Sequence, residues 1–345
     1  MSKLIDNSRQ IENLPSDWCG TSGGRGDVIE VSLDRMAPLP PAQRAFEQRP
    51  PVALAPILGV RQDSRVGADS SRALLLTILG EFVLPHSGRV WTQTLTGLLD
   101  PLGVQDKAAR QALARMHQRG WLERHKVGRQ AQWKLTDTAL QLLESGAQRI
   151  YAFGQQPRMW SGSWVVLLAS VTERDRHLRH RVTSGLNWAG FGSIGQGVWL
   201  SPWMEQEQAA VDLLGRVGVD AVTFRAELGH LGNPRELADE AWRLDELRAD
   251  YESFLADTDD LLAEAPTGEA AAAELASLVH RWRRFPFLDP DLPRELLPED
   301  WPGVAAAQRF GELRAALRPE AFAWWEASEA DRAPTASTGR GVLAG

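Results

Sequence analysis

The residues of this sequence best suited to binding another molecule lie between positions 106 and 118. The segment DKAARQALARMHQ predicts a helix with Asp106 as its N-cap. Ala109, Leu113 and Met116 fall on one apolar face of that helix. The opposite face carries arginine and glutamine side chains at Arg110, Gln111, Arg115 and Gln118. Such side chains form paired hydrogen bonds with base edges in the major groove of DNA, so the pattern favours a base-reading helix. A solvated helix face is the alternative.

A basic hairpin is predicted directly after this helix. Its strands run from Trp121 and Leu122 through the turn at Gly128 and back to Trp133 and Leu135, which we expect in the core. Four of its polar residues are candidates for contact with phosphate groups rather than bases: His125, Lys126, Arg129 and Gln130. A helix of this kind followed by a hairpin is the order of recognition helix and wing in a winged helix-turn-helix domain.

Most of the elements that must hold this helix and hairpin in place come earlier in the chain. The run RALLLTILGEFVL predicts an apolar helix capped by Ser70 or Ser71, and residues 85–88 form a turn. A short strand at Trp91 then leads into a helix capped by Thr92 and ending before Pro101. After the hairpin, Thr136 and Asp137 cap a further helix, which would connect to the next domain.

Composition is that of an ordinary globular protein, with 43% hydrophobic and 24% charged residues among 345. This length suffices for two or three domains, each with its own core. The single cysteine, Cys19, excludes an internal disulfide framework. No apolar run approaches the length of a membrane span, and no signal-peptide pattern is present at the N-terminus. We therefore expect a cytoplasmic protein.

The net charge of −7 is distributed unevenly. Residues 70–150 hold 11 Lys/Arg against 6 Asp/Glu, residues 151–234 hold 7 against 7, and residues 235–332 hold 11 against 23. Only the first block carries the positive field that attracts a phosphate backbone. The acidic block would limit nonspecific binding to DNA, or it is simply a solvated helical surface.

The pattern predicts an α+β protein with three domains and two flanking segments. Residues 1–69 are rich in Pro, Gly and Ser and are expected to be a mostly disordered extension, with a short docking segment at 52–60. Residues 70–150 form the winged helix-turn-helix DNA-binding domain. Residues 151–232 alternate strand, helix, strand, strand, helix and strand, which is the ferredoxin-like order. Residues 233–332 form an all-helical domain, and 333–345 form a tail.

Within the helical domain we expect one long helix from Asn233-Pro234 to about residue 265, then the helix EAAAELASLVHRWRRF. A Pro-rich loop, FPFLDPDLPRELLPEDWPG, and two helices ending near Glu329 complete it.

Three segments together resemble the PaaX family of bacterial repressors of phenylacetic acid catabolism. The predicted winged helix matches the beginning of the family, and NWAGFGSIGQGVWLSPW is similar to its L-x-W-x-G-F-G…G-V-W-x-x-P motif. That motif is carried here by Leu186, Trp188, residues 190–192 and 197–199, and Pro202. The segment HRWRRFPFLDPDLPRELLPEDWPG resembles the family's most characteristic loop. The resemblance covers about residues 70–330 and leaves the first 69 without a counterpart.

This resemblance implies a homodimer whose middle domain is Cas2-like and mediates dimerisation. It also implies a C-terminal domain that senses an aryl-acyl-CoA, usually phenylacetyl-CoA.

A basic helix in the middle domain is one candidate ligand site. Arg176 and Arg179 lie on it beside further basic residues, namely Arg174, His177, His180 and Arg181. The group is a solvated basic face, an anion site for CoA phosphates, or an additional DNA contact. His177 and His180 are spaced for a metal, but the surrounding arginines would repel a cation, so we expect no metal.

A second candidate precedes the Pro-rich loop. It comprises His280, Trp282, Arg283 and Arg284. These side chains either hold a CoA phosphate and an aryl-acyl group, or they fix the loop through an Arg284–Asp289 pair. Four tryptophans are candidates for an aromatic pocket, with core packing as the alternative: Trp188, Trp199, Trp203 and Trp301.

These patterns together predict a one-component transcriptional repressor. Two identical subunits would bind an inverted-repeat operator, and an aryl-acyl-CoA would release it. The sequence contains no P-loop or paired-cysteine motif, and we expect neither catalysis nor a cofactor. Two alternatives remain: a nucleic-acid-processing enzyme built on the Cas2-like domain, and a constitutive DNA-binding scaffold without a ligand.

Overall fold

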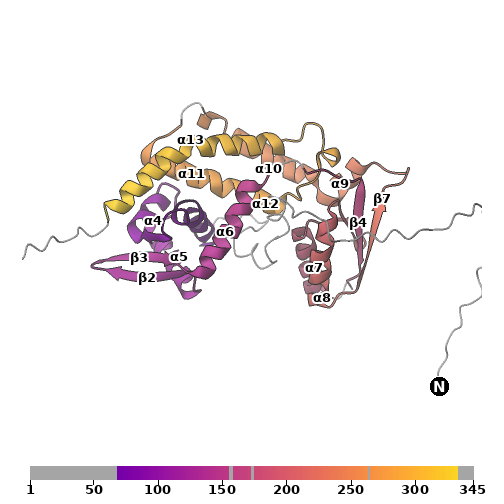
Figure 1. Cartoon of the computed structure of the whole chain (residues 1–345), viewed down its shortest axis with the longest axis horizontal. Helices are drawn as coiled ribbons and strands as arrows, with labels where there is room; N and C mark the ends of the chain where they lie inside the picture. The colour runs from indigo at the N-terminus through magenta and orange to yellow at the C-terminus, as the bar shows by residue number, and fades with distance from the viewer. Residues whose placement is uncertain (1–67, 155–157, 172–174, 263–264, 333–345) are drawn as a thin grey trace, which may run out of the picture. The chain divides into compact units, whose positions relative to one another are not determined.

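The computed structural model describes residues 68–154, 158–171, 175–262 and 265–332 (Figure 1). The predicted docking segment at 52–60, nearly all of the predicted N-terminal extension and the predicted tail therefore lie outside the described residues. None of the described helices combines the length and the apolar character needed to cross a membrane.

The first region combines helices with a small antiparallel sheet. Its elements are α3 (Ala68–Ile78), a π-helical turn η2 (Leu79–Val83), β1 (Arg89–Trp91), α4 (Thr92–Leu99), α5 (Asp106–Gln118), β2 (Leu122–Val127), β3 (Gln130–Leu135) and α6 (Asp137–Ala152). The strands lie in the order β1-β3-β2, so β1 pairs with the returning strand of the hairpin. The predicted element types and their order are confirmed for this region.

The helix starts in this region differ in part from the prediction. α3 begins at Ala68, ahead of Ser70 and Ser71. Gln105, not Asp106, occupies the N-cap position of α5, and the Asp106 side chain accepts a hydrogen bond from Arg110. Thr136 does cap α6, since its hydroxyl accepts a hydrogen bond from the Ala139 backbone N–H.

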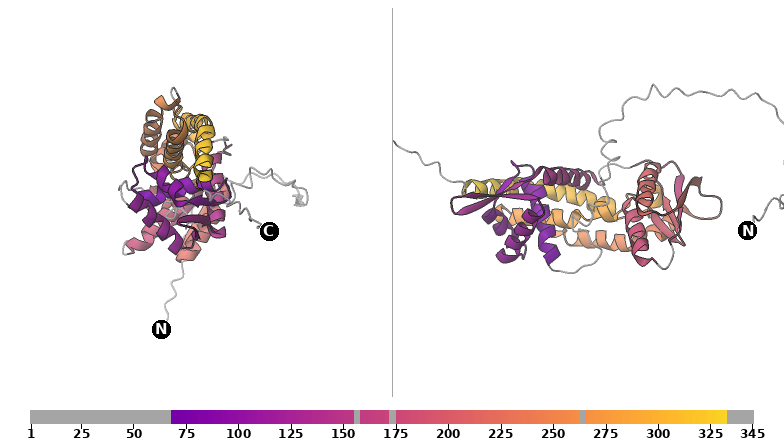
Figure 2. Two further views of the ribbon diagram at one scale, coloured as in Figure 1. Left: turned by 90° about the vertical axis from the view of Figure 1, so that its left-hand side faces the viewer. Right: turned by 90° about the horizontal axis from the view of Figure 1, so that it is seen from below.

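The middle region is a four-stranded antiparallel sheet with two helices. Its elements are β4 (Ser163–Ala169), α7 (Arg176–Trp188), β5 (Gly192–Gly195), β6 (Val198–Ser201), η3 (Met204–Gln206), α8 (Glu207–Val217) and β7 (Ala221–Glu227). The strand order is β5-β6-β4-β7, which confirms the predicted β-α-β-β-α-β arrangement. Val165 and Leu167 pack with α7 and α8, which lie together beside the sheet (Figures 1 and 2).

In the glycine-rich motif of this region, the backbone conformation and a close backbone contact require one of the glycines. Gly197 lies in the left-handed conformation (φ 79°), and its carbonyl accepts a hydrogen bond from the Ala169 N–H at 2.8 Å. A Cβ at Gly197 would lie 2.4 Å from the Ala169 carbonyl oxygen, so only glycine fits there.

The last region is helical. Its elements are α9 (Pro234–Trp242), α10 (Leu244–Ala256), η4 (Asp260–Leu262), α11 (Gly268–Trp282), α12 (Phe285–Leu288), η5 (Arg294–Leu296) and α13 (Gly303–Ala330). Asn233 caps α9, and Pro234 occupies its first turn.

Two helix predictions for this region are wrong. The single helix expected after Asn233 is divided into α9 and α10, because Arg243 adopts a left-handed conformation (φ 52°). The two helices expected at the end are one helix, α13, which continues through Pro319. The proline removes one backbone hydrogen bond, but the helix is held on one side by buried residues before and after it, among them Leu317 and Ala321.

One hydrophobic core spans the first and the last regions. Buried side chains of α3 to α6 form a single cluster with those of α10 to α13, and α11 and α13 lie against one another beside α4 (Figure 1). The middle region has a separate core, and a smaller cluster joins Trp164 on its sheet to α9 and the Pro-rich loop. The expectation that each predicted domain has its own core is therefore wrong for the first and last regions.

Candidate nucleic-acid interface

α5 divides into a buried face and an exposed polar face. Ala109, Ala112, Leu113 and Met116 are buried as α5 packs against α3 and α4. The four predicted base-reading side chains are all exposed: Arg110, Gln111, Arg115 and Gln118. Arg110 donates a hydrogen bond to Asp106 Oδ2 at 2.6 Å, which raises the pKa of Arg110 and lowers that of Asp106. Arg115 has no ion-pair partner among the described residues.

The β2–β3 hairpin presents a basic surface at its turn. The turn consists of Gly128, in a left-handed conformation, and Arg129, and it joins paired residues Val127 and Gln130. His125, Lys126 and Arg129 are exposed, and Gln130 is half-buried. His125 Nε2 lies 3.6 Å from Glu123 Oε2. The hairpin therefore presents its basic side chains to solvent near its tip.

Buried contacts at the base of the hairpin fix it to the helices. Trp133 is buried and donates its Nε1–H to Thr92 Oγ1 at 2.9 Å. Thr136 donates its hydroxyl to the Gly120 carbonyl at 2.8 Å, and its backbone N–H bonds the Trp121 carbonyl. Thr136 thus ties the start of α6 to the segment between α5 and β2. A shift of α6 would therefore displace the segment that joins α5 to the hairpin.

Two exposed arginines next to this surface were missed at the level of sequence. Arg119 follows α5, and Arg124 lies on β2 with its guanidinium 5.9 Å from the Trp133 ring centre. The sequence signal that could have indicated them is that both are basic residues within the positively charged block, residues 70–150. Together with the predicted residues they extend the positive surface from α5 onto the hairpin.

The structure separates the residues predicted to bind a ligand. Arg176 and Arg179 are exposed on α7, whereas Trp199 is buried in the core of the middle region. Trp188 is buried and stacks on Phe287 of α12 with ring centres 5.0 Å apart. His177 and His180 are exposed on α7, and no group of three metal-binding side chains occurs among the residues described.

The other four predicted ligand residues lie at the end of α11, in different environments. Trp282 is buried in the shared core and donates its Nε1–H to the Ile150 carbonyl at 3.2 Å. His280 Nδ1 lies 3.1 Å from Thr77 Oγ1. Burial, together with the charge of Arg283, lowers the pKa of His280 to about 3, so the imidazole is neutral at physiological pH.

Arg283 and Arg284 are neighbours with opposite exposure. Arg283 is 5% exposed, and burial lowers its pKa to about 10. Arg284 is exposed and pairs with Asp250 at 2.7 Å rather than with Asp289. The Arg284–Asp289 pair, the alternative to ligand binding, is therefore absent, and the Asp289 carboxylate instead accepts the Tyr251 hydroxyl at 2.7 Å. The Pro-rich loop is held at its start by Arg149, whose Nε–H bonds the Pro286 carbonyl at 3.0 Å.

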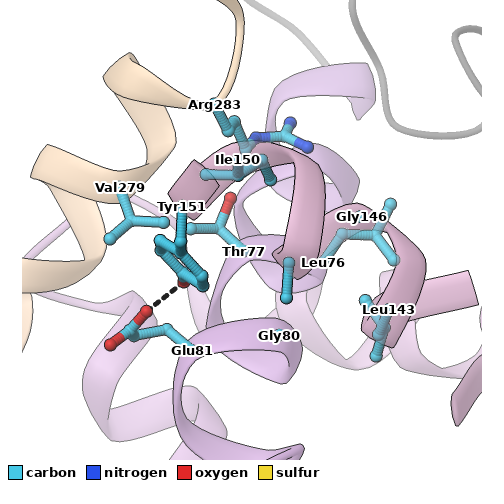
Figure 3. Close-up of a pocket in the computed structure, with 11 residues that line it drawn as sticks. Leu76, Thr77, Gly80, Glu81, Leu143, Gly146, Ile150, Tyr151, Val279 and Arg283 are labelled. Atoms are coloured by element: carbon cyan, nitrogen blue, oxygen red, sulfur yellow. Dashed lines mark hydrogen bonds between the residues drawn. The ribbon is translucent and has the colours of Figure 1, made fainter. Parts of the chain in front are cut away.

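A small pocket lies between α3, α6 and α11, and has a volume of about 30 Å³ (Figure 3). Arg283 lines one part of it, and Glu81 and Tyr151 line another. The Glu81 carboxylate is buried and accepts hydrogen bonds from the Tyr151 hydroxyl and from Arg314 Nη2, the latter at 3.0 Å. Burial and the Glu81 charge raise the pKa of Tyr151, which keeps its hydroxyl protonated.

A second, more open hollow of about 370 Å³ lies along α13. Its walls are formed by Arg314, Ala315, Arg318, Pro319 and Phe322. The Arg318 guanidinium lies 4.2 Å from the centre of the Phe322 ring.

Comparison with known proteins covers all three regions. Residues 70–139 match the PaaX-like protein model, residues 157–238 match the PaaX protein central Cas2-like domain, and residues 242–327 match the PaaX-like protein C-terminal domain. The chain is also 31% identical over 267 residues to the transcriptional repressor PaaX of Escherichia coli, covering 74% of this chain and 83% of that protein. The chain belongs to the PaaX family.

A solved structure supports the fold alone. An uncharacterized protein from Mycobacterium tuberculosis superposes with a TM-score of 0.50 at 23% identity, over 74% of this chain and 98% of that one. As a PaaX-family protein, the chain has a Cas2-like central domain with the antiparallel sheet described above.

Proposed function

We propose that this PaaX-family protein is a transcriptional repressor that binds double-stranded DNA through α5 and the β2–β3 hairpin. The observation that carries the proposal is the pairing of an exposed arginine- and glutamine-rich face on α5 with an adjoining exposed basic hairpin. The E. coli relative is itself a transcriptional repressor, which favours a regulator over a nucleic-acid-processing enzyme.

The first region acts in this proposal as a winged helix-turn-helix domain. α4 and α5 are joined by a short turn, and α5 presents the recognition face to the major groove. Arg110, Gln111, Arg115 and Gln118 contact base edges, while His125, Lys126, Arg129 and Gln130 contact the phosphate backbone. The positive charge of residues 70–150 supplies the attraction to DNA that does not depend on sequence.

The middle domain, residues 151–232, joins two copies of the chain in this proposal. One face of its sheet is covered by α7 and α8, whereas part of the other exposes Leu168, Val222 and Phe224. Leu168 and Val222 are paired across β4 and β7, and Phe224 lies two residues along on the same face. Exposed apolar side chains grouped in this way are typical of a protein interface. A twofold dimer would bind an inverted-repeat operator.

The helical region, residues 233–332, responds to an effector in this proposal. The family resemblance suggests an aryl-acyl-CoA such as phenylacetyl-CoA, which releases the operator by binding better to the DNA-free conformation. His280, Trp282, Arg283 and Arg284, at and just after the end of α11, remain the candidate effector residues, and the hollow at Arg314 and Arg318 is a second candidate position. A scaffold that represses without any ligand is the second candidate.

Substitution of the α5 arginines tests the DNA-binding helix. We expect Arg115→Ala to weaken operator binding by about 1–3 kcal/mol, because a bidentate base contact is lost. Arg110→Ala should fall at the lower end of that range, since Arg110 must leave Asp106 to reach a base. Quantitative footprinting of the full chain measures both, with Arg294→Ala, an exposed arginine on η5, as the matched control. Wild-type affinity in both α5 variants would contradict the assignment.

Substitution of the hairpin residues tests the phosphate contacts. Lys126→Ala and Arg129→Ala should each weaken operator and unrelated DNA equally, because phosphates carry no sequence information. Each should also reduce the slope of log affinity against log salt by about 1. Fluorescence anisotropy across a salt series measures both effects. A change of preference at a single base pair would make the hairpin a base reader and overturn this role.

A charged substitution on the exposed sheet face tests the dimer. Phe224 is 51% exposed, so Phe224→Lys should leave the fold intact while placing two like charges in the interface of the proposed dimer. We expect a monomer in sedimentation velocity at micromolar concentration, where the wild type is a dimer. Val304→Lys, at a 57% exposed site on α13, is the control and should remain dimeric. A Phe224→Lys dimer as stable as the wild type would rule out this interface.

A further inference from the structure

The charges of the middle region balance in number but not in position. Residues 151–234 hold 7 Lys/Arg against 7 Asp/Glu. Two of these arginines are neutralised by acidic partners, since Arg158 pairs with Glu205, and Arg225 donates to Glu207 Oε2 at 2.8 Å. Three other arginines lie together at the start of α7, namely Arg176, Arg179 and Arg181. A neutral total therefore conceals a local excess of positive charge.

The basic side chains of α7 face solvent without acidic partners. The three arginines and two histidines define the α7 basic face, and all five are exposed: Arg176, His177, Arg179, His180 and Arg181. Within the described part of the chain, none of them makes an ion pair or a side-chain hydrogen bond. On the opposite side of α7, Val182 and Leu186 are buried in the core of the middle region. The α7 basic face is therefore free to bind an anionic partner.

The arginines stand at the end of α7 where positive charge favours the helix least. The first turn of α7 contains no acidic residue, and its last turn contains no basic one. The N-terminal end of a helix carries partial positive charge, and like charges three residues apart, as at Arg176 and Arg179, repel one another. One carboxylate opposes this, because Asp175 caps α7 by accepting the Leu178 N–H at 2.9 Å. Side chains that work against the local structure in this way are typical of a binding surface.

The shape of the α7 basic face favours a long polyanion over a small ligand. It lies on the exposed side of a helix, and α7 contributes no residue to either of the two hollows described above. A small molecule is normally held in a concave site. From Arg176 to Arg181 the helix rises by about 7.5 Å. Phosphates follow one another at about 3.4 Å along one strand of a DNA duplex, so the face can span more than one of them.

We infer that the α7 basic face is a second contact surface for the phosphate backbone of double-stranded DNA, separate from α5 and the β2–β3 hairpin. The inference rests on the proposed function, because it extends the DNA contacts of a repressor to its middle region. Guanidinium groups match the geometry of phosphate oxygens. The contact carries no sequence information, since phosphates are the same at every base pair. It adds affinity for any duplex to the base contacts of α5.

Removal of the three arginine charges tests the inference without knowledge of the operator. We expect the variant Arg176→Gln/Arg179→Gln/Arg181→Gln of the full chain to bind a mixed-sequence duplex of about 40 base pairs about tenfold more weakly than the wild type at low salt. The slope of log affinity against log salt should fall by about 2, because each lost phosphate contact removes about 1. Fluorescence anisotropy across a salt series measures both effects.

Lysine at the same positions is the matched control. The variant Arg176→Lys/Arg179→Lys/Arg181→Lys keeps the three charges, and lysine binds phosphate as a point charge. Its affinity for the duplex and its salt slope should therefore stay close to those of the wild type. Equal losses in the lysine and glutamine variants would show that charge is not what the duplex recognises, and would overturn the inference.

Thermal unfolding separates a binding role from a structural one. The glutamine variant should unfold at the wild-type temperature or above it, because the substitutions remove like-charge repulsion and an unfavourable interaction with the helix dipole. A lower unfolding temperature that the lysine variant restores would show that these charges serve the fold. That result would also overturn the inference.

The wild type distinguishes failure of this inference from failure of the proposed function. If the wild type binds no duplex even at low salt, both fail. If it binds, and the glutamine variant keeps its affinity and salt slope, the α7 basic face is not a DNA contact, while the α5 surface is unaffected. Unchanged DNA binding with a loss of coenzyme A binding would assign the face to a small anion. Unchanged DNA binding with a loss of dimer in sedimentation velocity would assign it to an acidic surface of a second copy.

Discussion

The core shared by residues 68–154 and the C-terminal helices is the constraint on which the other features of this protein depend. Trp282 lies near its centre, 1% exposed, and stacks on Phe310 with ring centres 4.7 Å apart. Its indole N–H is bonded to the Ile150 carbonyl, so a side chain of α11 is fixed to the backbone of α6. Burial of large aromatic surface is the main source of stability in a core of this kind. Neither region can move far from the other without exposing it.

This arrangement brings polar groups from distant parts of the chain to the same boundary. Glu81 on η2 is joined to Arg314 on α13, and His280 on α11 to Thr77 on α3. Removing the Glu81 carboxylate would leave the Tyr151 hydroxyl and Arg314 without the acceptor that they share, which costs more than one hydrogen bond contributes. The C-terminal helices are therefore structurally joined to residues 68–154. Through α6 and Thr136, a change at this boundary has a direct path to the segment between α5 and β2.

The features predicted correctly from sequence are those encoded locally. The amphipathic spacing of α5, the turn at Gly128 and the alternation of strands and helices in the middle region all depend on near neighbours in the chain. The same is true of Thr136 at the start of α6. Local pattern was enough to find these elements and to place their polar side chains on exposed surfaces.

The predictions that failed depend on residues far apart in sequence. Proximity in the chain suggested that Arg284 pairs with Asp289, but Asp250 of α10 is its partner in the folded chain. Two helices were expected at the end of the helical domain, yet packing against the shared core holds α13 together as one helix through Pro319. Trp188 and Trp199, candidates for one aromatic pocket, have different surroundings: Trp199 is buried in the core of the middle region, whereas Trp188 stacks on Phe287 of α12. A local sequence pattern does not show which faces of distant helices and strands pack together.

The central claim is that residues 68–154 and the C-terminal helices fold as one unit. Residues 68–154 expressed alone, compared with the full chain by circular dichroism and operator binding, test it most directly. The shared core predicts that the isolated segment lacks a cooperative thermal transition and does not bind the operator, because its face toward α11 and α13 is exposed. A sharp transition together with operator half-site binding by the isolated segment would contradict the claim and show an independent DNA-binding domain.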